Sequence, residues 1–395
     1  MELLVKVLIG VGVISGITFI LLFGQLPALR KTPIGWLQRL LAVHIPYVFD
    51  TFDQRFTGGI LVRSIRQLTN YLFYKRNPVV LIIFLGILST ATFLFLSASW
   101  SQLSNLQLLP VLLIVPAPYI FTYLCATSTS IYITAANHAR RMTDYPYDHA
   151  LFHPGISCTT CKLPKPARSK HCSLCEACVS RSDHHCPWVN NCLGRENYRW
   201  FLALLLSLWV LESYGAYLGY TVLSPWLKFS TLSGLSFRSA EFWNRLALII
   251  MSATNAGGLS IAGVTILAFT TAPLPLGLLG YHVYLVWAGT TTNENSKWDY
   301  LGEDMGDGIV WKGKRTEVTA YKRRLAESRG EVAKVVEEVH VDWPIETDQV
   351  VVTTTDGLPP RGCEHLYEQV FSLKAVENLY DLGFWDNLMY VLRGR

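Results

Sequence analysis

The chain has 395 residues, of which 51% are hydrophobic and 16% are charged, and its mean hydropathy is positive. This composition excludes a disordered protein, is unlike that of an ordinary soluble enzyme, and is typical of a membrane protein with several spans. The formal net charge of +5 is modest for this length, and the basic residues gather in particular loops rather than along a stripe. We therefore do not expect a nucleic acid as a partner.

The first apolar run, Leu3 to Phe23, is long enough to cross a membrane, for which about 20 residues suffice. A cleaved signal peptide is the competing interpretation. We favour an uncleaved anchor because Glu2 accompanies Lys6 ahead of the run, and because small residues do not occupy both cleavage positions after it.

Further apolar runs of spanning length follow along the chain, at residues 79–100, 106–135 and 201–223. The last apolar region, residues 246–288, is too long for one ordinary span and is interrupted by Pro273 and Pro275. It fits a kinked long helix, an interfacial piece followed by a span, or two spans. Only the first two leave the C-terminus on the same side as the cysteine-rich segment.

The distribution of positive charge predicts the orientation of the chain. The loop over residues 25–77 contains eight Lys and Arg residues, whereas the connection at 101–105 contains none. The positive-inside rule places the first loop in the cytosol, and counting spans from there also places residues 136–199 in the cytosol. Apolar residues at helical spacing from Phe56 to Leu72 predict a helix that lies either in the membrane interface or on a covered face of the cytosolic loop.

Seven of the nine cysteines lie between Cys158 and Cys192. An odd number fits a disulfide framework poorly, and Cys-x2-Cys spacing with interspersed histidines indicates zinc, whose thiolate ligands favour the reducing cytosolic side. Seven cysteines and three histidines offer ten donors in this segment. Two closed zinc sites of four ligands each would leave two donors over.

The surplus donors suggest chemistry in addition to metal binding. His184 and His185 are adjacent, so their side chains diverge and do not easily share one tetrahedral ion. A spare histidine beside a spare thiol is the arrangement of an activated nucleophile, and Asp183 could orient the imidazole. The alternative, that all ten residues only bind metal, stays open on spacing alone. A RING-type ubiquitin ligase is disfavoured because the His-x2-Cys core of its cross-brace is missing.

The run from Asp183 to Trp188, followed by Asn191-Cys192, Gly194 and Asn197, resembles the signature of the DHHC family of integral-membrane protein S-acyltransferases. The upstream cysteines, Lys165-Pro166, Arg168-Ser169 and His171-Cys172 match the same domain. The resemblance implies that Cys186 is the acylated nucleophile, His184 its base and Asp183 the residue that polarises His184. It also implies two structural zinc ions, one held by Cys158, Cys161, His171 and Cys178, the other by Cys172, Cys175, His185 and Cys192.

Two further elements resemble motifs of the family, Thr291 to Glu294 and Asn378 to Gly383 with Asn387, and both are expected to brace the catalytic domain. The chain departs from the family at His153-Pro154-Gly155, where Asp-Pro-Gly is usual. The extra N-terminal span makes the chain most similar to the fungal endoplasmic-reticulum subgroup that acylates SNAREs next to their transmembrane segments. This similarity implies an endoplasmic-reticulum location, with the Golgi as the alternative.

The expected function is ping-pong transfer of a long-chain acyl group, palmitoyl, from acyl-CoA to cysteines of membrane proteins. We expect the CoA phosphates to contact Lys162, Lys165, Arg168 and Arg195. We expect His282, in the last apolar region, to be a packed or interfacial histidine, and we assign no chemistry to residues 296–360. The alternative function is a zinc-stabilised membrane scaffold or a quality-control factor for transmembrane clients.

The predicted fold is a polytopic α-helical membrane protein of about five spans, with a cytosolic two-zinc cysteine-rich domain between spans three and four. The expected parts, in chain order, are an anchor at 1–24, a cytosolic loop with an amphipathic helix at 25–77, a transmembrane hairpin at 78–136, the cysteine-rich domain at 137–199, the C-terminal spans with a lumenal loop at 200–289, and a cytosolic tail at 290–395.

Overall fold

The computed structural model describes residues 16–17, 19–20, 24, 29, 31–330 and 338–394. The chain divides into two compact units, residues 1–76 and residues 77–395, which we describe separately. Apart from four residues, the predicted first span, Leu3 to Phe23, lies outside the described part of the chain.

The first unit contains three described α-helices, α2 (Pro33–Arg39), α3 (Ile45–Thr57) and α4 (Ile60–Tyr74), with a π-helical turn between α2 and α3. Helices α3 and α4 are joined by Gly58 and Gly59, whose φ angles of 69° and 81° few other residues adopt readily. The buried carboxylate of Asp53 accepts hydrogen bonds from the backbone N–H groups of Leu61 and Val62. This side chain of α3 therefore caps the first turn of α4.

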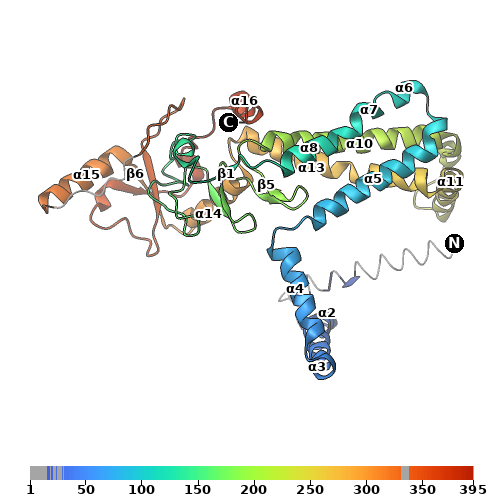
Figure 1. The fold of residues 1–395 in the computed structure, drawn as a ribbon, viewed down its shortest axis with the longest axis horizontal. Coiled ribbons are helices and arrows are strands. Elements are labelled where there is room, and N and C mark those ends of the chain that lie inside the picture. Colours follow the sequence, from blue (N-terminus) through green and yellow to red (C-terminus); the bar gives the residue numbers. More distant parts are fainter. Residues whose placement is uncertain are drawn as a thin grey trace. The chain divides into compact units, whose positions relative to one another are not determined.

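Four helices among the described residues are long and apolar enough to cross a membrane, Val79–Gln102, Asn105–Ala126, Tyr198–Trp226 and Ala240–Trp287. This agrees with the predicted polytopic class. The α-helices within them belong to the second unit (Figure 1): α5 (Val79–Ser99), α6 (Asn105–Leu108), α7 (Val111–Ile114), α8 (Pro116–Ala126), α10 (Tyr198–Leu223), α11 (Ala240–Gly258), α12 (Val264–Thr271) and α13 (Pro273–Trp287).

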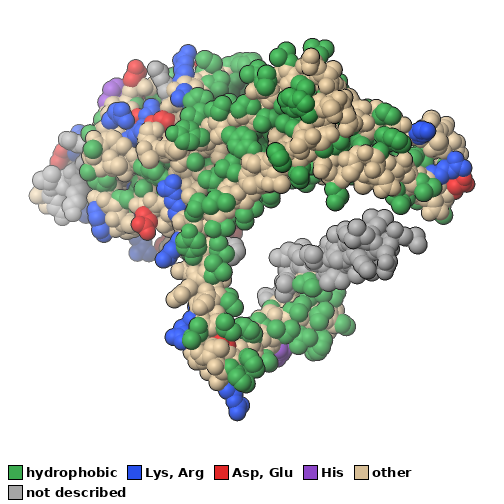
Figure 2. Space-filling view, turned by 45° about the vertical axis from the view of Figure 1, so that its right-hand side comes forward, with side chains coloured by type: hydrophobic (Ala, Val, Ile, Leu, Met, Phe, Trp, Pro, Cys, Tyr) green, Lys and Arg blue, Asp and Glu red, His purple; other side chains and the backbone are tan. Residues whose placement is uncertain are grey.

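Helix α10 lies at the centre of this bundle and contacts α8, α12 and α13. Gly219 of α10 lies so close to Thr265 that an added Cβ would approach the Thr265 hydroxyl to 1.8 Å, so the two helices cross at a glycine. Apolar side chains cover much of the outer surface of the bundle, and charged side chains gather toward its ends (Figure 2). This is the distribution that a hydrocarbon environment requires.

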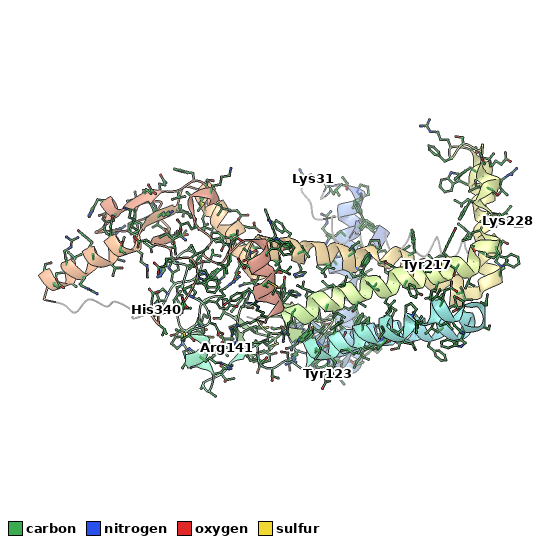
Figure 3. All side chains as sticks on the ribbon, turned by 90° about the horizontal axis from the view of Figure 1, so that it is seen from above. Lys31, Tyr123, Arg141, Tyr217, Lys228 and His340 are labelled. Atoms are coloured by element: carbon green, nitrogen blue, oxygen red, sulfur yellow. The ribbon has the colours of Figure 1, made fainter. Side chains whose placement is uncertain are left out.

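The last apolar region forms one candidate span of 48 residues that is not straight. Gly258 has a φ of 64°, a π-helical turn follows it, and α12 and α13 then continue to Trp287. Seen from above, α11 leaves the bundle at a steep angle near Lys228, at the end opposite Arg141 (Figure 3). The break falls at a glycine rather than at Pro273 or Pro275, because both prolines lie in the first turn of α13, where proline is tolerated.

The segment between α8 and α10 has little regular structure. It contains one short helix, α9 (His138–Arg141), and a small antiparallel sheet in the order β1-β3-β2, with a separate pair β4-β5. Such short strands cannot bury a large core, so other contacts have to hold them. The strands are β1 (Tyr132–Ile133), β2 (Lys170–Cys172), β3 (Ala177–Val179), β4 (His185–Cys186) and β5 (Asn191–Cys192).

The tail after the last span folds back against the cysteine-rich segment. Its antiparallel sheet has the order β7-β6-β8, and α16 packs against α13. Gly289, between α13 and α14, has a φ of 64°, and a Cβ there would lie 2.6 Å from the Cα of Asp381, so the turn requires glycine. The elements are α14 (Thr292–Gly306), β6 (Val310–Lys314), α15 (Arg315–Ser328), β7 (Gln349–Thr353), β8 (Tyr367–Gln369) and α16 (Phe384–Leu392).

Candidate active site and metal centres

The first predicted ligand set, Cys158, Cys161, His171 and Cys178, comes together in space. One ligand atom from each residue lies within 4.8 Å of the others. The Nδ1 atom of His171 is 3.3 Å from the Sγ of Cys161 and 3.8 Å from the Sγ of Cys178. Three thiols and one imidazole at this separation fit a tetrahedral zinc ion.

The second set, Cys172, Cys175, His185 and Cys192, forms a similar cluster within the same 4.8 Å limit. The Nδ1 atom of His185 lies 3.3 Å from the Sγ of Cys175, 3.8 Å from that of Cys172 and 3.7 Å from that of Cys192. All nine cysteines of the chain are free thiols in the structure. Both clusters therefore have the donor set that zinc prefers, with no disulfide competing for the sulfur atoms.

The strands explain why neighbouring residues serve different centres. Successive side chains of a strand point to opposite faces, so His171 and Cys172 of β2 reach different clusters. In the β4–β5 pair His185 lies directly opposite Cys192, and both belong to the second cluster. Cys186, the next residue of β4, consequently points away from the metal ligands. The structure thus separates Cys186, the one remaining thiol of the cysteine-rich segment, from the two clusters.

The Asp183 carboxylate, the His184 imidazole and the Cys186 thiol form a third group. Nδ1 of His184 is 2.6 Å from Oδ2 of Asp183. Burial lowers the pKa of His184, but its hydrogen bonds with Asp183 and Cys186 outweigh this effect and raise the pKa to about 9. For Asp183 burial acts in the opposite direction and raises the pKa of the carboxyl group. The hydrogen bond with His184 more than offsets this effect, so that the pKa of Asp183 is lowered overall. An imidazole of this kind can take the proton of a neighbouring thiol and keep it.

The N-terminus of α14 holds the Asp183 carboxylate from the other side. The backbone N–H of Thr292 donates to Oδ1 of Asp183 over 2.7 Å, and its hydroxyl donates to Oδ2 over 3.2 Å. Thr291 caps the helix and forms a capping box with Glu294. A helix N-terminus favours a negative charge, so the motif from Thr291 to Glu294 acts on Asp183 directly as well as bracing the domain.

Arg168, one of the expected CoA contacts, has a different place in the structure. Its guanidinium is 3% exposed and donates to the Glu294 carboxylate through Nε, over 2.7 Å, and Nη2, over 2.5 Å. It also stacks over the ring of Tyr380, 4.3 Å from the centroid. This leaves no surface for a phosphate, and the sequence could not show it because Arg168 and Glu294 are far apart in the chain. The structure thus gives Arg168 a buried ion pair where the sequence analysis expected an exposed charge.

The other expected CoA contacts differ in their surroundings. Arg195 forms an ion pair with Asp144, 2.6 Å from Nη1 to Oδ1, and is largely buried, so its charge is already balanced. Lys162 is exposed and Lys165 is half-buried. Of the four residues, the two lysines keep their charge accessible.

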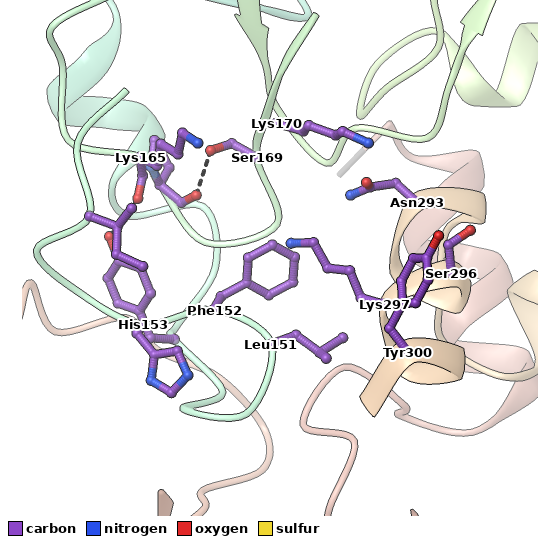
Figure 4. Close-up of a pocket in the computed structure, with 13 residues that line it drawn as sticks. Leu151, Phe152, His153, Lys165, Ser169, Lys170, Asn293, Ser296, Lys297 and Tyr300 are labelled. Carbon is purple, nitrogen blue, oxygen red and sulfur yellow. Dashed lines mark hydrogen bonds between the residues drawn. The ribbon is translucent and has the colours of Figure 1, made fainter. Parts of the chain in front are cut away.

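A cavity of about 340 Å³ lies between the cysteine-rich segment and α14, and three lysines line it, Lys165, Lys170 and Lys297 (Figure 4). The Nζ of Lys297 is 3.9 Å from the ring centroid of Phe152. Burial lowers the pKa of Lys297, and nearby carboxylates offset part of this effect. Sequence reasoning missed Lys297 because it lies far beyond the cysteine-rich segment in the sequence and joins it only in the fold.

The comparisons with known proteins agree with this geometry. The model of the DHHC palmitoyltransferase family matches residues 152–299. Palmitoyltransferase SWF1 of Neurospora crassa is 42% identical over 403 residues, which cover 96% of this chain and 89% of the relative. Palmitoyltransferase swf1 of Emericella nidulans is 40% identical over 404 residues, with 95% and 94% covered.

A more distant relative, Palmitoyltransferase ZDHHC4 of Mus musculus, is 38% identical over 154 residues, which cover 38% of this chain and 45% of the relative. The fungal relatives, in contrast, align along nearly their whole lengths. With the matching domain and the paired cysteine–histidine clusters, this shows that the chain belongs to the DHHC palmitoyltransferase family of protein S-acyltransferases.

Proposed function

We propose that this enzyme carries the acyl group on Cys186. The proposal is supported by the neighbours of Cys186. This cysteine and His184 both lie outside the two metal clusters and are hydrogen-bonded to each other, and His184 is also hydrogen-bonded to the buried carboxylate of Asp183. His184 takes the proton of the thiol, and the Cys186 thiolate attacks the thioester carbonyl of acyl-CoA. The bond to the CoA sulfur breaks, and the CoA thiolate leaves and takes up the proton from His184.

The second step repeats the exchange with a protein as acceptor. A substrate cysteine gives its proton to His184 and attacks the carbonyl of the acyl-enzyme, and the Cys186 thiolate leaves. Each step exchanges one thioester for another, so the protein has to lower the barrier rather than shift the equilibrium. An activated thiol and a positioned acyl group are sufficient for that task.

The surroundings of Cys186 support a place for the acyl chain. The residue is 3% exposed and packs with Phe201 and Leu205 of α10 and Val286 of α13, which are parts of the membrane bundle. An acyl chain attached to Cys186 would enter apolar surroundings without leaving the enzyme. We infer that the bundle supplies the binding site for the chain.

We propose that the CoA phosphates bind at the lysine-lined cavity rather than at Arg168. Lys165 and Lys170 come from the cysteine-rich segment and Lys297 from α14, so the cavity brings three positive charges together from two parts of the chain. The rings of Tyr147, Phe152 and Tyr300 also line it. Cations beside flat apolar surfaces suit a phosphorylated nucleotide. Lys162 remains a candidate at the exposed surface.

We also propose that the two clusters are structural zinc sites with the ligand partition given above. When bound, each ion would fix loops that have little hydrophobic core of their own, on the order of 10 kcal/mol per site. The zinc ions would leave Cys186, His184 and Asp183 free for the reaction.

We propose that the cysteine-rich segment, the loop before α5 and the tail face the cytosol, in the endoplasmic-reticulum membrane or, alternatively, the Golgi. Helices α3 and α4 support a position in the membrane interface for the loop, because Phe49, Phe52 and Phe56 of α3 and Ile65 and Leu68 of α4 are exposed. The proposed substrates are SNAREs with cysteines next to their transmembrane segments.

The test is autoacylation. The full chain, purified in detergent, is incubated with a tagged palmitoyl-CoA, as wild type and as Cys186→Ser, with and without hydroxylamine. We expect label on the wild type only and release by hydroxylamine, which cleaves thioesters. A folded wild type with two zinc ions and no label would refute the acyl-enzyme and leave the scaffold function in its place.

A further inference from the structure

A second histidine, His282 of α13, lies directly against His184. Its ring stacks on that of His184 with the centroids 5.9 Å apart and the planes at 28°. His282 is 1% exposed, and its nitrogen, a nitrogen of His184 and an oxygen of Asp183 lie within 4.8 Å of one another. A polar ring so deeply buried beside a reactive group needs a reason beyond packing.

A buried tyrosine forms a hydrogen bond with His282. The hydroxyl of Tyr198, the first residue of α10, lies 2.8 Å from Nδ1 of His282, and both side chains are buried. Phe201 presses edge-on against both histidine rings, 5.6 Å from that of His184 and 5.0 Å from that of His282. The position of the His282 ring is therefore fixed by contacts with both Tyr198 and Phe201.

We propose that Tyr198 and His282 form a positioning pair for His184. The proposal rests on the proposed function, in which His184 receives the proton of Cys186. The rings of His282 and Phe201 lie on two sides of the His184 imidazole and restrict the orientations that it can adopt. The hydrogen bond between Tyr198 and His282 holds the His282 ring in this place.

The pair joins two membrane helices to the catalytic histidine. Tyr198 begins α10 and His282 lies near the end of α13, while His184 belongs to the loop that precedes β4. The thiol and its base thus meet the bundle at the point where the acyl chain would enter it. The active site is then completed by the spans and not by the cysteine-rich segment alone.

The test is a double-mutant cycle on the full-length enzyme with Tyr198→Phe, His282→Phe and the double variant. We expect each single variant to lower the maximal rate of autoacylation about three- to tenfold, the effect of losing one neutral hydrogen bond, with the KM for palmitoyl-CoA unchanged. The double variant should be no slower than the slower single variant, because both lose the same bond. Tyr217→Phe, at an exposed position of the same helix, is the matched control and should behave as the wild type.

Zinc content and thermal stability distinguish positioning from folding. Variants that keep two zinc ions and the wild-type Tm but react more slowly support the proposal. If His282→Phe loses zinc, the choice between positioning and folding rests on Tyr198→Phe alone, because that substitution removes only one oxygen atom. Wild-type rates in Tyr198→Phe, or strictly additive effects in the double variant, overturn the positioning pair. A wild type without hydroxylamine-sensitive label would overturn both this inference and the proposed function, whereas a labelled wild type with unaffected variants overturns this inference only.

Discussion

Replacing Arg168 by Gln should destabilise the protein rather than weaken its binding of acyl-CoA. In the wild type the guanidinium makes two hydrogen bonds to Glu294 and a third, of 3.1 Å, to the carbonyl of Gly289. Arg168→Gln leaves the Glu294 carboxylate, which is 1% exposed, without its cation. Removing one partner of a buried ion pair costs about 3–5 kcal/mol.

The loss should appear as a lower Tm, by about 6–20 °C for a domain of 150 to 250 residues. Thermal unfolding in detergent can be followed with a thiol-reactive dye, because unfolding exposes the buried cysteines. The double variant Arg168→Gln with Glu294→Gln should recover part of the loss, since the uncompensated charge is gone. Arg195→Gln, whose ion pair with Asp144 is more exposed, should cost less than Arg168→Gln.

The same variant tests our proposal that the CoA phosphates bind at the lysine cavity rather than at Arg168. At a temperature where Arg168→Gln is folded, its KM for palmitoyl-CoA should stay within about twofold of the wild type, because a buried ion pair offers no surface to a phosphate. An unchanged Tm together with a KM raised tenfold would refute the reasoning and return Arg168 to the CoA site.

The remaining predictions concern the zinc clusters, the lysine cavity and the helix N-terminus. Cys158→Ala should lose zinc and unfold the cysteine-rich segment, whereas Cys186→Ser should keep two zinc ions per chain, as metal analysis would show; fewer in Cys186→Ser would contradict the partition. Lys297→Gln should raise the KM for palmitoyl-CoA about three- to tenfold at low salt and less at high salt, while Lys322→Gln on α15 should not. Thr292→Val removes one hydrogen bond to the Asp183 carboxylate and should slow autoacylation about threefold with zinc retained; an unchanged rate would show that the backbone N–H of residue 292 is enough to hold this carboxylate.

The sequence predicts much of this protein because its strongest signals are local. The apolar runs mark the spans, and those in the described part of the chain appear in the structure within a few residues. The exception is the predicted third span, which ends at Ala126 rather than near residue 135. The spacing of the cysteines and histidines indicates two metal sites with a thiol and an imidazole left over. These patterns can be recognised without tertiary contacts, because the length of a membrane span and the spacing of metal ligands are properties of short stretches of chain.

The sequence could not predict contacts between residues far apart in the chain. The sequence suggests that Arg168 is a surface cation, but in the structure it forms a buried ion pair with Glu294. Lys297 lies in a stretch to which no chemistry was assigned, but in the structure it is one of the three lysines that line the cavity. His282 reads as a packed histidine, and only the fold places it against His184. In each case an element far along the sequence, α13 or α14, returns to the cysteine-rich segment. The local pattern therefore determined which groups are available for metal and thiol chemistry. The tertiary structure decided which charges are paired, which side chains stay accessible and which residues come into contact, because charge pairing and burial depend on neighbours in space.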